Sequence, residues 1–323
     1  MKIAHLALAA VLTASPFTAT VAQTVYPTKP VKIIVPFSAG GIVDSVARLV
    51  GDRLSTMNGQ PFIIENKTGA GGAIGTDFVA KAPPDGYTLL AVSPSHAVGP
   101  SLQKNIAWNP VRDFKAVAGF GFVPNVIVVN PSVPVTNMSQ LIALAKKSNP
   151  TLTYASAGLG TSNHLSGELL AQEAHIQLTH IPYKGQSDAL SDLLGGRVAM
   201  MPLTAALAMS HVKTGKLRAL AVTSAKRASA LPELPTVAEA AQLPNYEVSA
   251  WFGLVAPAKT PPMVLQKLAA DIEKVLAQPE VKAKFDTLGM ELSPQAPTQF
   301  DTFIAKEQDK WSKVIKQAGI EPN

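Results

Sequence analysis

The sequence contains no cysteine, and this absence excludes disulfide bonds, thiol nucleophiles and cysteine-ligated metal sites. Its six histidines form no H-x-H or H-x-x-x-H arrangement, so neither a zinc site nor any other cofactor is expected. Only 15% of the residues are charged, and the net charge of +6 is scattered rather than gathered into a Lys/Arg stripe. This pattern argues against nucleic acid as a partner and suits anionic small solutes.

The sequence also has little that could cross a membrane. Lys2 precedes a mostly apolar run over residues 3–12, which is shorter than the about 20 residues that span a bilayer. Small residues follow as far as Ala22, a pattern typical of a secretory signal peptide. We therefore predict that residues 1–22 are a signal peptide cleaved before Gln23, and that the protein is exported.

The stretch from Tyr154 to Gly185 combines a short strand, a turn of small and hydroxyl residues, and a helix. Leu165, Leu169 and Ala174 recur at helical spacing after this turn, so the turn ends where unpaired backbone N–H groups and the positive end of a helix dipole point outward. Such a place is a ready-made seat for an anion. Glycine-rich turns of this kind are common in α/β proteins, however, and many bind nothing.

A second turn of the same kind lies far upstream and favours function. The apolar run over residues 31–35 predicts a buried parallel strand, and the helix expected from Ile42 is ended by Gly59. Asp44 falls in the first turn of that helix, where it either caps the helix or orders the loop around a ligand. Downstream, GAGGAIG over residues 69–75 resembles a dinucleotide fingerprint but has Ile74 in place of the third glycine. Ser95 and His96 are expected in a further loop, after a strand that ends at Val92.

The order of the elements indicates an α/β fold with two units. A first unit leads into a long apolar stretch over residues 116–129, broken by Pro124 and Asn125, and a second unit follows before another long stretch over residues 248–255. The chain then returns to the first unit. We predict two Rossmann-like domains joined by crossing hinge strands, with a ligand cleft between them. Domain 1 is expected over residues 23–123 and 250–323, and domain 2 over residues 124–249.

From Tyr26 to about Ile320 the chain resembles the Bug-type receptors, which are the periplasmic substrate-binding proteins of tripartite tricarboxylate transporters. The motifs that carry this resemblance occur in order along the chain. They are PFSAGGIVDSVAR (36–48), ENKTGAGGAIGTDFVAKAPPDGYTL (65–89), YASAGLGTSNHLSGEL (154–169), HIPYKGQSDALSDLLGGRV (180–198), GKLRALAVTSAKR (215–227), LPTVAEA (234–240) and WFGLVAP (251–257).

The resemblance implies a monomeric, periplasmic, Venus-flytrap protein that closes over a small organic carboxylate and delivers it to membrane transporter subunits. In this family the anion is held mostly by backbone amides and hydroxyls of two facing loops. The first loop would be Phe37, Ser38, Ala39, Gly40, Gly41 and Asp44. The second would be Ser156, Ala157, Gly158, Gly160, Thr161 and His164, with Ser95, His96 and Tyr183 along the sides.

The chain departs from the family pattern at one position that bears on specificity. Members commonly carry an Asp after G-G-x-V, whereas this chain has Ala199, and the following strand is apolar. An ammonium facing this wall would be desolvated without a partner, so we expect the pocket to reject amino acids. The expected ligand has one or two carboxylates and an apolar or aromatic body that packs against Tyr183, Met201, Pro202 and Leu203. The alternative is that another acid, such as Asp44, receives an ammonium.

Two other classes of function remain open. The same clamp would serve an exported sensor that signals to a membrane partner, and the sequence does not separate this role from transport. An enzyme is disfavoured, although Ser101-Leu102-Gln103-Lys104 is an S-x-x-K motif and Lys213-Thr214-Gly215 is a K-T-G motif. No S-D-N intervenes, and Lys213 stands at an expected helix end. His164 is expected to act as a neutral hydrogen-bonding strut rather than a general base.

Overall fold

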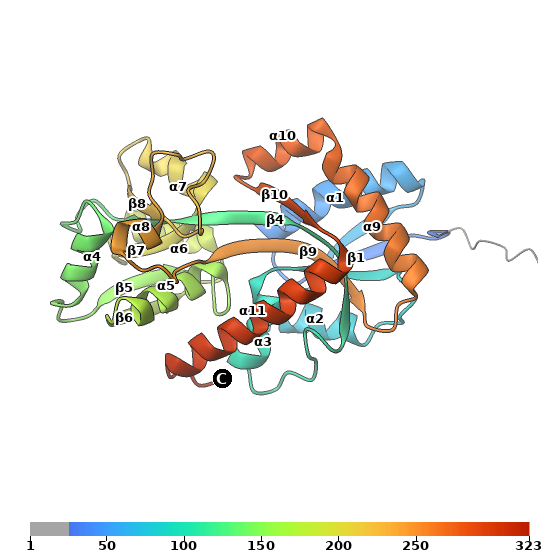
Figure 1. Cartoon of the computed structure of the whole chain (residues 1–323), viewed down its shortest axis with the longest axis horizontal. Helices are drawn as coiled ribbons and strands as arrows, with labels where there is room; N and C mark the ends of the chain where they lie inside the picture. Colours follow the sequence, from blue (N-terminus) through green and yellow to red (C-terminus); the bar gives the residue numbers. More distant parts are fainter. Residues whose placement is uncertain (1–25, 323) are drawn as a thin grey trace, which may run out of the picture.

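A computed structural model describes residues 26–322, and the predicted signal peptide lies outside these residues. The described chain forms two lobes that are joined by long strands (Figure 1). Buried, β-branched runs form parallel strands in both lobes, and amphipathic segments cover them as helices.

The first lobe is built on a mixed sheet whose parallel strands carry the N-terminal part of the chain. Strand β1 pairs in parallel with β2 and β3, while β9 and β10 run antiparallel to their neighbours. The order is β2 (Phe62–Asn66), β1 (Val31–Val35), β3 (Thr88–Val92), β9 (Ser249–Pro257) and β4 (Phe114–Val129), with β10 (Glu291–Gln295) on β4. Its helices are α1 (Ile42–Asn58), the 3-10 turn η1 (Ala70–Gly72), α2 (Ala73–Ala80), α3 (Pro94–Leu102), α9 (Pro262–Ala277), α10 (Pro279–Thr287) and α11 (Pro297–Gln317).

The second lobe includes the far half of β4 in its own sheet, between β7 and β8. Strand β5 pairs in parallel with β6 and β7, and both β7 and β8 run antiparallel to β4. These strands are β7 (Met200–Thr204), β5 (Leu152–Ser156), β6 (Leu178–Pro182) and β8 (Arg218–Val222). Its helices are α4 (Met138–Ala145), α5 (Ser162–Glu173), α6 (Gln186–Leu194), α7 (Ala205–Val212) and α8 (Val237–Ala241).

Strands β4 and β9 run side by side between the lobes (Figure 1). The pairing of β4 with β9 ends at Pro124, opposite Ser249, and its pairing with β7 begins at Asn125, opposite Thr204. The strand therefore changes partner between two consecutive residues, although Pro124 does not break it. This position coincides with the expected domain boundary, which stays a prediction.

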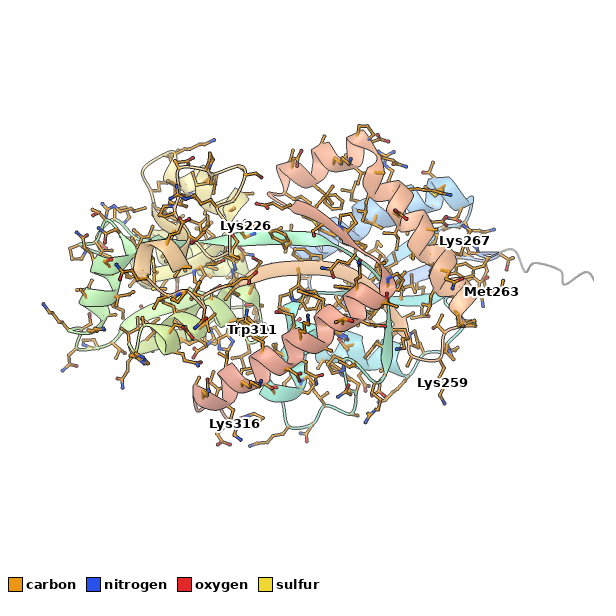
Figure 2. All side chains as sticks on the ribbon, in the orientation of Figure 1. Lys226, Lys259, Met263, Lys267, Trp311 and Lys316 are labelled. Atoms are coloured by element: carbon orange, nitrogen blue, oxygen red, sulfur yellow. The ribbon has the colours of Figure 1, made fainter. Side chains whose placement is uncertain are left out.

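Helix α11 extends from the first lobe to the second (Figure 1). Phe300 near its start is buried among residues of the first lobe, whereas Trp311 and Val314 belong to an apolar cluster with Tyr154 and Leu165 of the second lobe. Figure 2 shows Trp311 among the labelled side chains of this helix. The final helix thus contributes to the cores of both lobes.

The fold tests three sequence predictions about local structure. The strand over residues 31–35 and the helix from Ile42 are confirmed, and Gly59 ends that helix in the left-handed conformation, with φ of 63°. The prediction that Ser95 and His96 lie in a loop is wrong, because they form the first turn of α3, whose N-cap is Ser93. Pro94 at the first helical position explains the difference, since its fixed φ suits a helix start.

Candidate ligand-binding loops

The first candidate loop connects β1 to α1. Val35 and Pro36 are buried, and the exposed residues Ser38, Ala39, Gly40 and Gly41 then lead into the helix. Gly41 is the N-cap, and no side chain caps the helix. The first N–H groups of this 17-residue helix are therefore left without a partner from within the helix, which favours an anion at this end.

Asp44 orders this loop and does not cap the helix. It is 2% exposed, and its carboxylate accepts hydrogen bonds from the Gly40 N–H, from Arg48 Nε and from Asn66 Nδ2, each at 2.9 Å. Asn66 Nδ2 also donates to the Phe37 carbonyl at 2.9 Å, so the carboxylate is linked to both ends of the loop. Burial alone would raise the pKa of Asp44, but the hydrogen bonds from Arg48, Gly40 and Asn66 outweigh it and lower the pKa.

Neither of the two side chains that donate hydrogen bonds to Asp44 was identified from the sequence. Arg48 was detectable, because it stands four residues after Asp44 on the same helix face. Asn66 is the last residue of β2, which is parallel to β1, and the carboxyl ends of adjacent parallel strands meet at one edge of a sheet. Since all the acceptor oxygens of Asp44 face donors, the alternative that it receives a ligand ammonium loses support.

The second candidate loop connects β5 to α5 and is shaped by its own hydroxyl groups. Thr161 is the N-cap of α5, and its Oγ1 donates to the Gly158 carbonyl at 2.7 Å. Ser156 Oγ accepts from the Gly158 N–H at 3.0 Å. Gly158 and Gly160 adopt φ values of 117° and 75°, which explains the need for glycine at both positions. The two predicted hydroxyls therefore hold the loop in shape.

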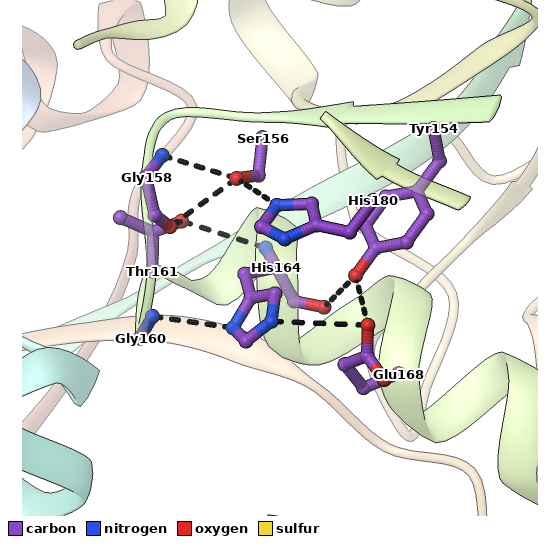
Figure 3. A network of polar contacts seen from close by, with 8 residues as sticks. All are labelled: Tyr154, Ser156, Gly158, Gly160, Thr161, His164, Glu168 and His180. Atoms are coloured by element: carbon purple, nitrogen blue, oxygen red, sulfur yellow. Dashed lines mark hydrogen bonds and ion pairs between the residues drawn. The ribbon is translucent and has the colours of Figure 1, made fainter. Parts of the chain in front are cut away.

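Two neighbouring histidines, whose rings are tilted by 32° relative to each other, lie next to this loop (Figure 3). His164 Nδ1 accepts from the Gly160 N–H at 3.2 Å, and His180 Nε2 lies 2.7 Å from Ser156 Oγ, with the two rings 4.3 Å apart. Burial lowers the pKa of His164 to about 3, with a smaller effect from His180, and burial lowers the pKa of His180 to about 4. Both rings are thus neutral near pH 7, which agrees with the expected role of His164 as a strut. His180 was not singled out from the sequence.

The network continues to a carboxyl group inside the second lobe. Glu168 Oε1 lies 2.5 Å from the Tyr154 hydroxyl and 3.8 Å from His164 Nε2 (Figure 3). Burial raises the pKa of Glu168 despite the hydrogen bond from Tyr154. Because His164 Nδ1 accepts from the Gly160 N–H, the proton of the neutral ring lies on Nε2, on the side of Glu168.

The structure brings the two loops toward each other through η1 and α3. A methyl group placed on Gly72 would lie 3.4 Å from the Phe37 ring, and one placed on Gly71 would lie 3.7 Å from the Leu159 carbonyl. A methyl group on Gly160 would lie 3.0 Å from Val98 and 3.7 Å from Ser95 Cα. The glycine-rich segment over residues 69–75 thus leads into α2 and contacts both loops.

Several predicted contacts lie outside this region. His96 is 3% exposed, stacks on Trp108 at 5.5 Å and meets the Phe114 ring edge-on at 4.8 Å. Burial lowers the pKa of His96 to about 3. Met201 and Leu203 have no exposed surface and belong to the core of the second lobe, because β7 is flanked by β4 and β5.

The remaining residues of the expected apolar wall have polar roles. Tyr183 donates from its hydroxyl to Asp192 at 2.6 Å and packs against the core of the second lobe. The Pro202 carbonyl accepts from Asn163 Nδ2. Ala157, from the second loop, is half-buried beside Gly158. The apolar wall predicted from the sequence is thus largely part of the core.

The K-T-G motif at the end of α7 has a structural explanation. Lys213 is the C-cap residue of α7, and Gly215 closes the following turn with φ of 71°, which accounts for the K-T-G motif by helix capping. Within residues 26–322, no cluster of three His, Asp or Glu side chains is placed to hold a metal ion. Lys226, Lys259, Lys267 and Lys316 lie on separate parts of the surface (Figure 2).

No helix of the described chain combines the length and apolar character that a membrane crossing requires. The fold is similar to that of known binding proteins. Rhodopseudomonas palustris Rpa4515, solved with adipate, superimposes with a TM-score of 0.84 at 36% identity, and the match covers 92% of this chain and 100% of that one. MatC from the same organism, solved with bound malate, gives a TM-score of 0.80 at 31% identity, covering 90% and 100%. These matches confirm the predicted two-domain α/β fold of a periplasmic binding protein.

Sequence comparison agrees with the structural matches. The chain is 37% identical to protein BugT of Bordetella pertussis over 303 residues, which cover 93% of each chain. The tripartite tricarboxylate transporter family receptor profile matches residues 46–320. The chain therefore belongs to the tripartite tricarboxylate transporter receptor family, as its motifs predict.

Proposed function

We propose that this protein binds a small carboxylate between the β1–α1 and β5–α5 loops and delivers it to a membrane transporter. The observation that carries this proposal is the pair of glycine-rich loops, each of which leads into a helix N-terminus. No side chain caps α1, and the side-chain cap of α5 takes only the His164 N–H, so each helix start keeps backbone N–H groups without a partner within the helix. Adipate in Rpa4515 and malate in MatC support a ligand of this chemical class.

The proposed ligand contacts follow the exposure and hydrogen bonding of the two loops. In the first loop, the backbone of residues 38–41 is exposed and no side chain covers the helix start. In the second, Thr161 and Ser156 hold the turn open, so the carboxylate meets backbone N–H groups rather than the hydroxyls that were expected to bind it. Phe37 and Ser95 lie beside these loops and complete the proposed site.

The proposed ligand is anionic and lacks an ammonium group. Asp44 is 2% exposed and already accepts three hydrogen bonds, so it offers little surface to an ammonium. Ala199 does not form a wall of this site, because it lies at the other end of β7, where its N–H donates to Thr153 Oγ1. An ammonium would be desolvated without a partner, which costs several kcal/mol. We expect glutarate to bind more tightly than glutamate in calorimetry. Tighter binding of glutamate would show that the site contains an anion that this account does not include.

A thermal-shift panel of mono-, di- and tricarboxylates, aromatic acids and amino acids tests the proposal. At a concentration about 100 times its Kd, a ligand stabilises the folded protein by about 2.7 kcal/mol, which raises Tm by several degrees. The shift should persist in excess chelator, since backbone N–H groups need no metal. Loss of the shift with chelator, or no shift with any carboxylate, would refute the proposed mode of binding.

The place of action and the partners are part of the same proposal. We infer export to the periplasm from the signal-like residues 1–22 and from the family, and we infer that the protein acts as a monomer. Co-purification of the ligand-loaded protein with the membrane subunits of a transporter would support delivery. Co-purification with a signalling protein instead would favour the sensor role.

A further inference from the structure

Asn125 occupies the point where the hinge strand passes from one lobe to the other. It is fully buried in β4, and its pairing with Thr204 follows directly after the last pair of β4 with β9. Both backbone groups of Asn125 are hydrogen-bonded to Thr223: the Asn125 N–H donates to Thr223 Oγ1, and the Asn125 carbonyl accepts from Thr223. The hydrogen bonding of its side-chain amide is less complete.

The orientation of this side chain is fixed by its neighbour on α5. Asn163 Nδ2 donates to the Pro202 carbonyl at 2.5 Å and to Asn125 Oδ1 at 3.3 Å. Because a backbone carbonyl can only accept, the Asn163 amide nitrogen must face Pro202, and Asn125 must present its oxygen to that nitrogen. The amide nitrogen of Asn125 therefore points away from Asn163.

Asn125 Nδ2 has no hydrogen-bond partner, although it is buried. Two N–H donors without an acceptor are costly in a protein interior, and such groups are rare in native structures. Flipping the amide would not relieve the cost, because it would set Asn125 Nδ2 against Asn163 Nδ2. Asn125 Nδ2 would therefore stabilise a hydrogen-bond acceptor that comes from outside the chain.

The start of α5 provides further donors at the same place. Asn163 is two residues after the N-cap Thr161, so the backbone N–H groups of Ser162 and Asn163 are among the first of a 12-residue helix and have no partner within it. The first turn of α5 carries no acidic residue, and the adjacent His164 is neutral. The start of α5 therefore offers donors and no acidic side chain in its first turn.

We infer that Asn125 Nδ2 donates a hydrogen bond to a carboxylate oxygen of the bound solute and makes the site selective for anions. This inference rests on the proposed function, and it adds a contact from the hinge strand to the two loops. The Asn125 amide can offer only N–H groups to a ligand, because its oxygen already accepts a hydrogen bond from Asn163. An anion is thus favoured over a neutral or cationic group of the same shape.

Titration calorimetry of Asn125 variants with adipate, malate and glutarate tests this inference. Asn125→Leu keeps the size of the side chain and removes the donors, and it should weaken binding roughly 10-fold without lowering the apo Tm. Asn125→Asp still accepts from Asn163 but faces the ligand with a negative charge, and it should weaken binding roughly 30-fold or more.

Asn130 supplies a matched control, since it is also a buried asparagine and follows the same strand. Its Nδ2 donates to the Leu193 carbonyl at 2.8 Å, and its Oδ1 accepts from Ser132, so its amide is satisfied. Asn130→Leu should lower the apo Tm and leave affinity unchanged.

Two results would overturn the inference. Affinity of Asn125→Leu within about threefold of the wild type would show that the amide contacts only water or core atoms. Failure of the wild-type protein to bind any of the three carboxylates would instead refute the proposed function, and the inference would fall with it.

Discussion

Replacing Asp44 with alanine should disorder the first loop and abolish ligand binding. The substitution removes the shared acceptor of the Gly40 N–H, Arg48 and Asn66. Hydrogen bonds to a charged group contribute about 1.5 to 3 kcal/mol each when they are buried. The Arg48 side chain is 46% exposed and regains water, so its bond counts for less than about 1 kcal/mol. Asn66 keeps its bond to Phe37. The free energy of unfolding should therefore fall by about 3 kcal/mol.

Urea denaturation measures this loss, and calorimetry with the best carboxylate measures binding. Arg48→Met is the matched control, because it removes only the exposed half of the ion pair and should cost less than about 1 kcal/mol with the loop and affinity preserved. An Asp44→Ala protein that binds with wild-type affinity would refute the claim that this carboxylate shapes the site.

The pH dependence of the same variant gives an independent check. The folded-state pKa of Asp44 is lowered, so its contribution to stability is fully present above the unfolded pKa of about 3.9 and is lost as pH falls through the folded pKa. The difference in unfolding free energy between wild type and Asp44→Ala should be constant from pH 5 to 8 and shrink below pH 4. A difference that shrinks near neutral pH would mean that another group is responsible.

Three further predictions concern the second loop. Thr161→Ala removes the N-cap and should lower the free energy of unfolding by about 1 kcal/mol, whereas Thr161→Ser should retain it, as urea denaturation would show. Gly160→Val introduces a side chain against Val98 in a backbone conformation with φ of 75°, so it should lower both Tm and affinity, and an unchanged Tm would contradict the observed contact. Burial lowers the pKa of His164 to about 3 and of His180 to about 4, so their contribution to stability is present above the unfolded pKa of about 6.5 and declines below it. A His164→Gln protein should therefore lose less stability than the wild type between pH 7 and 4. Equal losses in the two proteins would contradict this.

The sequence predicted most of the fold because its signals are local. The apolar run of β1, the helical spacing of α1 and the left-handed glycine at its end all lie within about 30 consecutive residues. The two candidate turns could likewise be identified, because each is a short run between a strand and a helix.

The missing parts of the site depend on contacts between distant residues. Asn66 reaches Asp44 from a neighbouring strand, and His180 reaches Ser156 from another. His96 was placed at the ligand because it follows a strand end, but the indole of Trp108 and the ring of Phe114 enclose it. Burial by tertiary packing cannot be deduced from the residues next to a histidine in the sequence.

A crystal structure of the protein with adipate is the measurement that tests the central claim most directly. We predict carboxylate oxygens within about 2.7 to 3.2 Å of backbone nitrogens at the starts of α1 and α5. Adipate held through Lys184 or other charged side chains, or bound away from both loops, would contradict the claim that two helix N-termini hold the ligand.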